Sequence, residues 1–268
     1  MPSLAQAVIL GLIQGLTEFL PVSSSAHLIL ARAFFGFDGD KFGLPFDVAC
    51  HVGTLIAVVI YFWRDLVEMI AALPRLFDWT DARAREIWLL AIGTLPAIAA
   101  GLLFKHVIEE RLRTPAVAAA MLAIGSAVFI AAERSGTKDR SDRSLTAMEA
   151  FWIGCAQAVA LVPGVSRSGI TISTALLFGL RRPDAARFIF LLAIPAILGA
   201  AGSEAPKALK AGVGGETATL FLVGIVASAI VGYLAIKYFI RYLGNHSLDA
   251  FAWYRLALAA ATVVWLIV

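Results

Sequence analysis

The sequence predicts an all-α polytopic membrane protein with six transmembrane helices and two re-entrant helical hairpins in inverted-topology repeats. The first observation behind this is composition: of 268 residues, 60% are hydrophobic and only 15% are charged. The other two are a set of long apolar stretches and two shorter apolar pairs that are broken in the middle. A soluble domain of this size needs a polar exterior that this composition cannot supply, which excludes soluble and disordered proteins.

Six apolar stretches are long enough, at 1.5 Å rise per residue, to cross most or all of a hydrocarbon core of about 30 Å. We expect these spans near residues 46–63, 86–104, 115–132, 188–203, 217–236 and 250–268. The fourth is short, and it would rely on the flanking Asp184 and Arg187 to reach the membrane interface.

Two further apolar segments are interrupted. Residues 4–20 and 25–35 are separated by a Pro-Val-Ser run, and residues 147–162 and 168–180 by a Pro-Gly-Val-Ser-Arg run. Each half is expected to be too short to span alone. A break of this kind frees backbone groups that lipid cannot satisfy, so it must be buried in protein or line a wet cavity. We therefore expect two re-entrant hairpins, each of which enters and leaves on the same side.

The two breaks also resemble each other. Residues 14–27 align without a gap with residues 157–170, at an offset of 143, with identities at Gln14/Gln157, Val22/Val165, Ser23/Ser166 and Ser25/Ser168. The chain then reads as a single membrane domain, 1–268, with repeat one at about 1–135 and repeat two at about 147–268. Because each repeat holds three spans, an odd number, the second must lie inverted relative to the first, and broken helices then meet near the midplane.

Loop charges predict the orientation. Loops on the side opposite the N-terminus hold 13 cations: Arg64, Arg75, Arg83, Arg85, Arg134, Lys138, Arg140, Arg143, Arg181, Arg182, Arg187, Lys237 and Arg241. Loops on the N-terminal side hold six: Lys41, Lys105, Arg111, Arg113, Lys207 and Lys210. The first side should be cytoplasmic, with both termini outside. This spread of charge over loops fits a membrane protein better than a nucleic-acid-binding surface, so no nucleic-acid partner is expected.

The first break carries acidic, amide, hydroxyl and imidazole groups. Gln14 and Glu18 share one helix face at i, i+4, and their oxygens suit a hard divalent cation, Mg²⁺ or Ca²⁺, with room left for water and phosphate. The alternative for Gln14 is hydrogen bonding between packed helices. Ser24 is a candidate nucleophile or phosphate ligand, and His27, three residues later, a candidate proton shuttle. Ser23 and Ser25 are candidate substrate ligands beside them.

The second break carries a guanidinium. Arg167 needs an anion at membrane depth, and its planar fork matches phosphate oxygens. Around it, Gly164 would let the backbone approach a ligand closely, and Ser168 and Thr171 would lie where a helix N-terminus can bind an anion. Ser166 is a further candidate substrate ligand. The alternative is a structural Arg167–Glu18 ion pair between the hairpins, which is compatible with a site that opens for substrate.

Other polar residues are weaker candidates. His51 lies in a span behind Asp47, and the sequence leaves open whether it supports the site or packs between helices. Cys50 and Cys155 lie in apolar stretches, where unpaired thiols are expected.

An acid, an imidazole and a guanidinium around a cation have the composition of a phosphoryl-transfer site. The second hypothesis is a secondary transporter or lipid flippase, because inverted repeats with broken helices are also transporter architecture. A serine–histidine pair beside a carboxylate favours the enzyme, since transport does not require it. A purely structural scaffold does not explain why charge gathers at both breaks.

At these residues the sequence resembles the undecaprenyl-diphosphate phosphatases, also called bacitracin-resistance proteins. The resemblance is carried by two motifs, QGLTEFLPVSSSAH (14–27) and PGVSRSGIT (163–171), with flanking similarity in FDVACHVGT (46–54) and FLLAIPAILGA (190–200). The resemblance to this family covers nearly the whole chain. The arginine motif of the other lipid phosphatase class requires a histidine six residues after the arginine, where this chain has Ser173.

The resemblance implies removal of the terminal phosphate from undecaprenyl diphosphate, which regenerates the carrier lipid of bacterial cell-wall synthesis and counters bacitracin. It implies metal-assisted binding at Glu18 and Gln14, chemistry at Ser24 and His27, and phosphate clamping by Arg167, Ser166 and Thr171. Gln14 replaces an acid, which leaves one charge fewer for the cation. The implied location is the bacterial inner membrane with the site facing the periplasm or exterior, and a homodimer is a compatible assembly.

Overall fold

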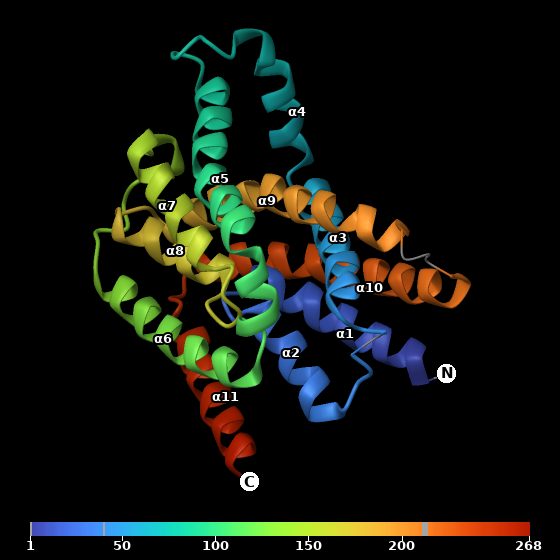
Figure 1. Ribbon diagram of the computed structural model, residues 1–268. Helices are drawn as coiled ribbons and strands as arrows, with labels where there is room; N and C mark the ends of the chain where they lie inside the picture. The colour runs from blue at the N-terminus through green and yellow to red at the C-terminus, as the bar shows by residue number, and fades with distance from the viewer. Residues whose placement is uncertain (1, 40, 211–213) are drawn as a thin grey trace.

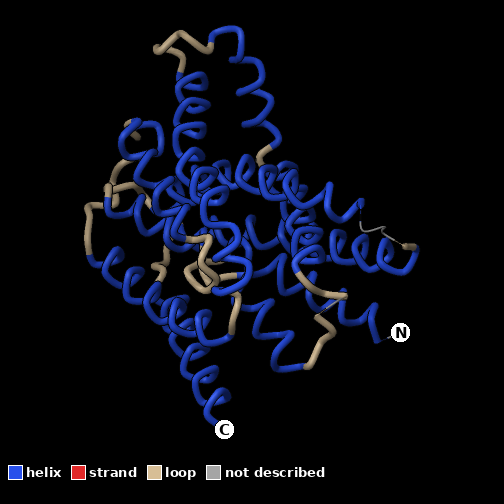
Figure 2. The backbone as a smooth tube through the Cα atoms, in the orientation of Figure 1, coloured by secondary structure: helices blue, strands red, loops and turns tan. Residues whose placement is uncertain are grey.

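The structure, a computed structural model, describes residues 2–39, 41–210 and 214–268, and within these ranges the regular structure is helical, with no strand (Figures 1 and 2). The helices are α1 (Pro2–Phe19), α2 (Ser24–Phe35), α3 (Leu44–Tyr61), α4 (Trp63–Ala72), α5 (Ala82–Val107), α6 (Pro115–Arg134), α7 (Ala147–Val159), α8 (Arg167–Leu177), α9 (Arg182–Lys210), α10 (Gly215–Leu243) and α11 (Asp249–Ile267). Short 3₁₀ turns cover Leu73–Arg75 and Asp142–Ser144, and a π turn, Ile108–Leu112, ends α5.

Six of the described helices are long and apolar enough to cross a membrane, which confirms the all-α fold with six predicted spans. They are α3, α5, α6, α9, α10 and α11. The chain is therefore a multi-pass membrane protein. In Figure 1, α4 and the adjoining half of α5 stand out from the other helices, and α11 runs away from the centre to the C-terminus.

The fourth span is longer than the sequence suggested. Its apolar part covers Arg182–Ser203, 22 residues, because the charged residues ahead of position 188 are already helical. Arg187 forms ion pairs with Glu86 and Asp142, the latter on the loop before α7, and also with Asp65 on α4. Pairing removes the cost of an isolated charge near the apolar segment, so the helix begins six residues earlier than expected.

The two interrupted segments form helix–break–helix units, α1–α2 and α7–α8, as the sequence predicted. None of the four halves is among the six candidate spans of the described residues; the apolar part of α1, the longest half, covers only Ser3–Phe19. The other three halves have 12, 13 and 11 residues. The re-entrant course of both units in a bilayer stays a prediction.

Helix packing is reciprocal between the two halves of the chain. α1 packs along α10, and α7 packs along α5. Both crossings need glycine: a Cβ on Gly11 would come within 2.9 Å of the Gly224 carbonyl oxygen, and a Cβ on Gly154 within 2.9 Å of the Gly93 carbonyl carbon. Gly11 and Gly154 are themselves 143 residues apart, the offset of the sequence repeat. The division into two inverted repeats stays a prediction, to which this packing gives support.

The two breaks have matching backbones. Ser23 has φ 73° and ψ 93°, and Ser166 has φ 74° and ψ 109°. This left-handed region costs a residue other than glycine about 1–3 kcal/mol, so the surrounding structure must hold it. Each serine caps the following helix, since its Oγ accepts from the backbone N–H of Ala26 at 3.4 Å or Gly169 at 3.2 Å.

The main hydrophobic core lies between α3, α5, α7, α8, α9 and α10, with the Phe19, Phe62, Phe190 and Phe239 rings in contact at its centre. It fixes the end of α1 against α9, next to the breaks. Of the loop cations that predict the orientation, Lys105, Lys207 and Lys210 have side chains outside the described residues.

Candidate active site

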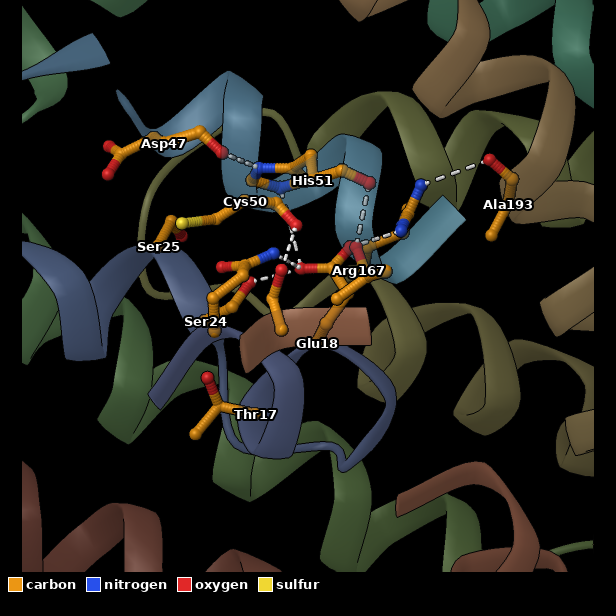
Figure 3. Close-up of polar contacts among 12 residues, drawn as sticks. Thr17, Glu18, Ser24, Ser25, Asp47, Cys50, His51, Arg167 and Ala193 are labelled. Carbon is orange, nitrogen blue, oxygen red and sulfur yellow. Dashed lines mark hydrogen bonds and ion pairs between the residues drawn. The ribbon is translucent and has the colours of Figure 1, made fainter. Parts of the chain in front are cut away.

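The site is built around the Glu18 carboxylate, at the last turn of α1. Gln14, one turn earlier, donates through Nε2 to Glu18 Oε2 at 2.8 Å, as the i, i+4 spacing predicted. Only 4% of the Glu18 side chain is exposed. A buried carboxylate needs several donors around it. Figure 3 shows that these donors come from both breaks and from α3.

Ser24 is the donor from the first break. Its Oγ donates to Glu18 Oε2 at 2.6 Å, a short hydrogen bond to a charged acceptor. Ser24 is the first residue of α2, and the turn at Ser23 brings it back over the end of α1. The hydroxyl proton of Ser24 therefore already points at a carboxylate.

Arg167 is the donor from the second break. Its Nη2 forms an ion pair with Glu18 Oε1, and its Nη1 lies 3.5 Å from the carbonyl oxygen of Ala193 on α9. The Arg167 side chain is 20% exposed, so one face of the guanidinium remains open. The structure thus contains the ion pair between hairpins that the sequence analysis gave as an alternative, and the pair brings the acid and the cation of the two breaks together.

His51, on the second turn of α3, also faces Glu18. Its Nε2 lies 3.4 Å from Glu18 Oε2, and its Nδ1 lies 2.7 Å from the backbone oxygen of Asp47 (Figure 3). The sequence left the place of His51 open, and the structure puts it in the site. The Asp47 carboxylate itself turns away and binds Arg32 and Arg113.

His27 is engaged elsewhere. Its Nδ1 lies 2.8 Å from the backbone oxygen of Ser23, and its Nε2 lies 2.8 Å from the hydroxyl of Tyr254 on α11. The i, i+3 spacing from Ser24 permitted a contact between the two side chains, but both imidazole nitrogens already have other partners. The catalytic role expected of His27 stays a prediction, and it needs a side-chain rearrangement.

The remaining predicted ligands hold the two breaks in shape. Ser23 and Ser166 cap α2 and α8, and each Oγ lies near a second serine, 3.2 Å from Ser25 Oγ and 3.4 Å from Ser168 Oγ. Ser168 Oγ also donates to the backbone oxygen of Leu20 at 3.1 Å, which joins the breaks.

The last two predicted ligands also have local roles. The buried Thr171 donates to the Arg167 carbonyl within its own helix, at 2.6 Å. Gly164 has φ 99°, and a Cβ there would meet Met121 and the backbone of Ala118 on α6. Substrate binding by Thr171 and Gly164 stays a prediction.

The oxygens of Gln14 and Glu18 fit a hard divalent cation. Gln14 Oε1 is buried and has no hydrogen-bond partner among the described residues, so it could bind a cation. The described residues hold no group of three or more His, Cys, Asp or Glu that could bind a metal by themselves. The donor set therefore suits Mg²⁺ or Ca²⁺ that shares its coordination with water and substrate phosphate, which is the usual mode for Mg²⁺.

Comparison with known proteins supplies the family. The family model described as bacitracin resistance protein BacA matches residues 7–261. The chain belongs to the BacA family. Proteins called undecaprenyl-diphosphatase are similar over nearly the whole chain. One from Rubrobacter xylanophilus is 49% identical, covering 100% of both chains. One from Geotalea daltonii is 42% identical, covering 98% of both, and one from Thermomicrobium roseum 44%, covering 94% of both.

The BacA family match includes both breaks and α11 as far as residue 261. In this part of α11 the structure adds two residues that the sequence analysis overlooked. Tyr254 holds His27, and Arg255 is fully buried beside both breaks. A signal was present, because Arg255 is an ionisable residue inside a predicted span, and such residues are candidates by default.

Proposed function

We propose that this BacA-family chain is a membrane phosphatase that hydrolyses undecaprenyl diphosphate to undecaprenyl phosphate and inorganic phosphate. The observation that carries the proposal is the convergence of Ser24, His51 and Arg167 on one buried carboxylate, Glu18. The names of the similar proteins support the same substrate. Recycling of this carrier lipid serves cell-wall synthesis, and it accounts for the bacitracin resistance in the family description.

Binding exchanges one anion for another at Arg167. The guanidinium is paired with Glu18 and has an open face. A terminal phosphate can take over its fork, because guanidinium and phosphate form bidentate hydrogen bonds. Glu18 Oε1 then becomes free, and together with Gln14 Oε1 it would hold the cation. That cation, Mg²⁺ or Ca²⁺, would neutralise phosphate charge.

The same exchange prepares the nucleophile. Ser24 already donates to Glu18 Oε2 at 2.6 Å, so the carboxylate can accept the proton as Ser24 Oγ attacks the terminal phosphorus. The Oγ–P bond forms, and the bond from phosphorus to the bridging oxygen breaks, which releases undecaprenyl phosphate. Water then attacks the phosphorus, the Ser24 Oγ–P bond breaks, Glu18 returns its proton to Oγ, and inorganic phosphate leaves. As an imidazolium, His51 would stabilise the charge at Glu18 through its Nε2–H group. A second route, attack by water or by His27, keeps the same binding groups.

The decisive experiment is release of inorganic phosphate by purified protein supplied with undecaprenyl or farnesyl diphosphate. We expect turnover that needs a divalent cation and that ceases in Glu18→Gln. Release that equals a protein-free control would reject the phosphatase and favour the transporter or flippase, which lipid transfer between leaflets of a liposome would then detect.

We further propose that both termini and the site face the periplasm or cell exterior, in the bacterial inner membrane. The excess of cationic loops on the opposite side supports this orientation. Cysteine labelling from outside intact cells tests it at Ser203→Cys, an exposed position near the end of the fourth span. The compatible homodimer belongs to the proposal, and light scattering of the detergent-solubilised protein measures it.

A further inference from the structure

Arg255, on the second turn of α11, has an unusual environment. It is 0% exposed, and no carboxylate of the described residues lies within ion-pair distance of its guanidinium. Its acceptors are backbone oxygens and one hydroxyl, and the ring of Phe129 lies 4.5 Å from its Cζ. A buried cation without an anion is costly, so the partial charges around it must compensate for the missing anion.

Those acceptors come from both breaks. Arg255 Nη2 donates to the Gly164 carbonyl at 2.9 Å, and Nη1 donates to the carbonyls of Val165 at 3.1 Å and Pro21 at 3.4 Å. The remaining acceptors lie on α6: the carbonyls of Met121 and Leu122, each 3.2 Å from Nη2, and Ser126 Oγ, 3.3 Å from Nε. One side chain thus joins the break after α1, the break after α7 and the neighbouring helix α6.

The convergence of these carbonyl groups on one arginine has a physical reason. Each broken unit brings one helix C-terminus, with free carbonyls, and one helix N-terminus, with free N–H groups, to the interior. The N-termini of α2 and α8 carry Ser24 and Arg167, at the site. The carbonyls that follow α1 and α7 need a donor that lipid cannot supply. A guanidinium has five N–H donors in a fixed plane, which suits several carbonyls at once.

We propose that Arg255 is a positioning residue that holds the two breaks in the register in which Ser24 and Arg167 meet at Glu18. Arg255 does not touch substrate, because it is fully buried and each of its nitrogens already faces protein acceptors. The adjacent Tyr254 adds a contact to the first break through His27. The last helix of the chain therefore sets the geometry of a site to which it contributes no reacting group. This inference rests on the proposed function, since it concerns the geometry of that site.

The test uses full-length protein in detergent or nanodiscs, with farnesyl diphosphate as substrate. We expect Arg255→Met to lower kcat about 100-fold, because a displacement of about 1 Å has an effect of this size, while KM changes less than about threefold. Arg255→Lys keeps the charge but not the planar fork, so we expect a loss of about tenfold. A role confined to folding predicts a reduced amount of protein with unchanged kcat, and that result would overturn the proposal.

Gly125→Ala provides a test that leaves Arg255 chemically intact. Gly125 lies on α6, and a Cβ there would overlap the Arg255 guanidinium and lie 3.1 Å from the Val165 carbonyl oxygen. We expect Gly125→Ala to reproduce the fall in kcat. Gly199→Ala on α9 is the matched control, because nothing lies within 4 Å of its added Cβ, and it should keep wild-type kcat.

Hydrogen exchange makes the proposal testable apart from the activity. We expect Arg255→Met to increase deuterium uptake at residues 20–24 and 163–168 at least about tenfold in rate, with α10 unchanged. Wild-type protein without phosphate release would refute the proposed function, and the exchange data would still decide the role of Arg255. Unchanged exchange at both breaks together with unchanged kcat would refute the positioning role while leaving the phosphatase intact.

Discussion

Arg167 and Glu18 form an ion pair between α8 and α1, although 149 residues separate them in the chain. In this pair the two charges neutralise each other. The Glu18 carboxylate, which would accept a proton, is bound to the Arg167 guanidinium, which would bind phosphate. In the proposed mechanism, a substrate phosphate that pairs with Arg167 would release Glu18. Loss of Arg167 should therefore impair substrate binding as well as the chemical step.

We predict that Arg167→Ala lowers kcat/KM for farnesyl diphosphate at least about 100-fold, because phosphate charge then has no guanidinium opposite it in a site of low dielectric. Phosphate release under saturating Mg²⁺ or Ca²⁺ measures the effect. Arg181→Ala is the control, since Arg181 is exposed and, among the described residues, forms its ion pair with the neighbouring Asp184, and it should keep full activity. Near-wild-type turnover in Arg167→Ala would show that the second break does not contribute to the active site.

Ser24 gives the second prediction. If Ser24 Oγ attacks phosphorus, Ser24→Ala should lose at least about 10³-fold in kcat, and wild-type protein quenched during turnover should carry one phosphate on the peptide that contains residue 24. Mass spectrometry of that peptide decides between attack by Ser24 and attack by water. Ser25→Ala should retain most activity, because Ser25 Oγ contacts Ser23 rather than Glu18. A Ser24→Ala variant with ordinary turnover would favour water as the nucleophile.

Much of this arrangement follows from the sequence, for identifiable reasons. The six spans follow from apolar length, and the joining of the breaks follows from the rule that charge inside a membrane must be paired. The 143-residue offset paired Ser23 with Ser166, and the structure shows that both cap a helix, although the sequence analysis gave them only as candidate substrate ligands. The packing of individual side chains could not be predicted from the sequence. The ring of His27 contacts Tyr254, and His51 lies beside Glu18. Both outcomes depend on where α3 and α11 pack, which no local pattern specifies.

The start of α9 shows a different limit. Hydropathy alone placed the span at residue 188, but the ion pairs of Arg187 with residues from α4, α5 and the loop before α7 let the helix begin at Arg182. A hydropathy window counts each charge as a penalty because it cannot know the partner. The missed importance of Arg255 has the same origin, since its partners are carbonyls, which have no sequence signature.

Gln14 gives the third prediction. Its orphaned Oε1 should be a weak cation ligand, so Gln14→Glu should lower the Mg²⁺ or Ca²⁺ concentration for half-maximal phosphate release about tenfold, and Gln14→Ala should raise it. Titration of EDTA-treated protein with each cation measures the shift. Gln157→Ala is the matched control: this glutamine is buried at the same repeat position, but Leu161 stands where Glu18 would be. An equal shift in Gln157→Ala would argue against a cation at Gln14.

The loop before α7 gives a prediction about stability. Glu149 closes a capping box with Thr146 and forms a two-pronged ion pair with Arg140, with N–O distances of 2.7 and 3.1 Å. The Arg140 hydrogen bond is the main reason why the pKa of Glu149 lies below its ordinary value of 4.5. Because the pKa is lower in the folded state, the ionised carboxyl stabilises the folded protein, and this contribution is complete at pH values above the unfolded-state pKa. The contribution disappears as pH falls from about 4.5 through the lowered pKa.

We therefore expect Glu149→Gln to lower the free energy of unfolding by about 1–2 kcal/mol at pH 7, and the melting temperature by about 2–6 °C. Below the lowered pKa the variant and the wild type should converge. Thermal unfolding in detergent, at pH 7 and then at successively lower pH, measures both effects. Glu216→Gln should change neither, because Glu216 is 71% exposed and its pair with Lys41 is solvated. A constant difference between variant and wild type across this pH range would exclude the ion pair as the cause.

The two histidines give the last prediction. The Asp47 carbonyl can only accept, so His51 Nδ1 carries a proton, and Nε2 can donate to Glu18 only in the imidazolium form, in which both nitrogens carry a proton. His51→Ala should lower kcat about 10–100-fold, whereas His51→Gln, which keeps an N–H group at similar reach, should recover part of it. If His27 acts only through its present contact, Tyr254→Phe should share much of the His27→Ala defect, since both remove the 2.8 Å hydrogen bond. Comparison of kcat among these variants assigns the roles. Full activity in His51→Ala together with an inactive His27→Ala would show that His27 transfers the proton. The His27 ring would then have to move from Tyr254 toward Ser24 during turnover.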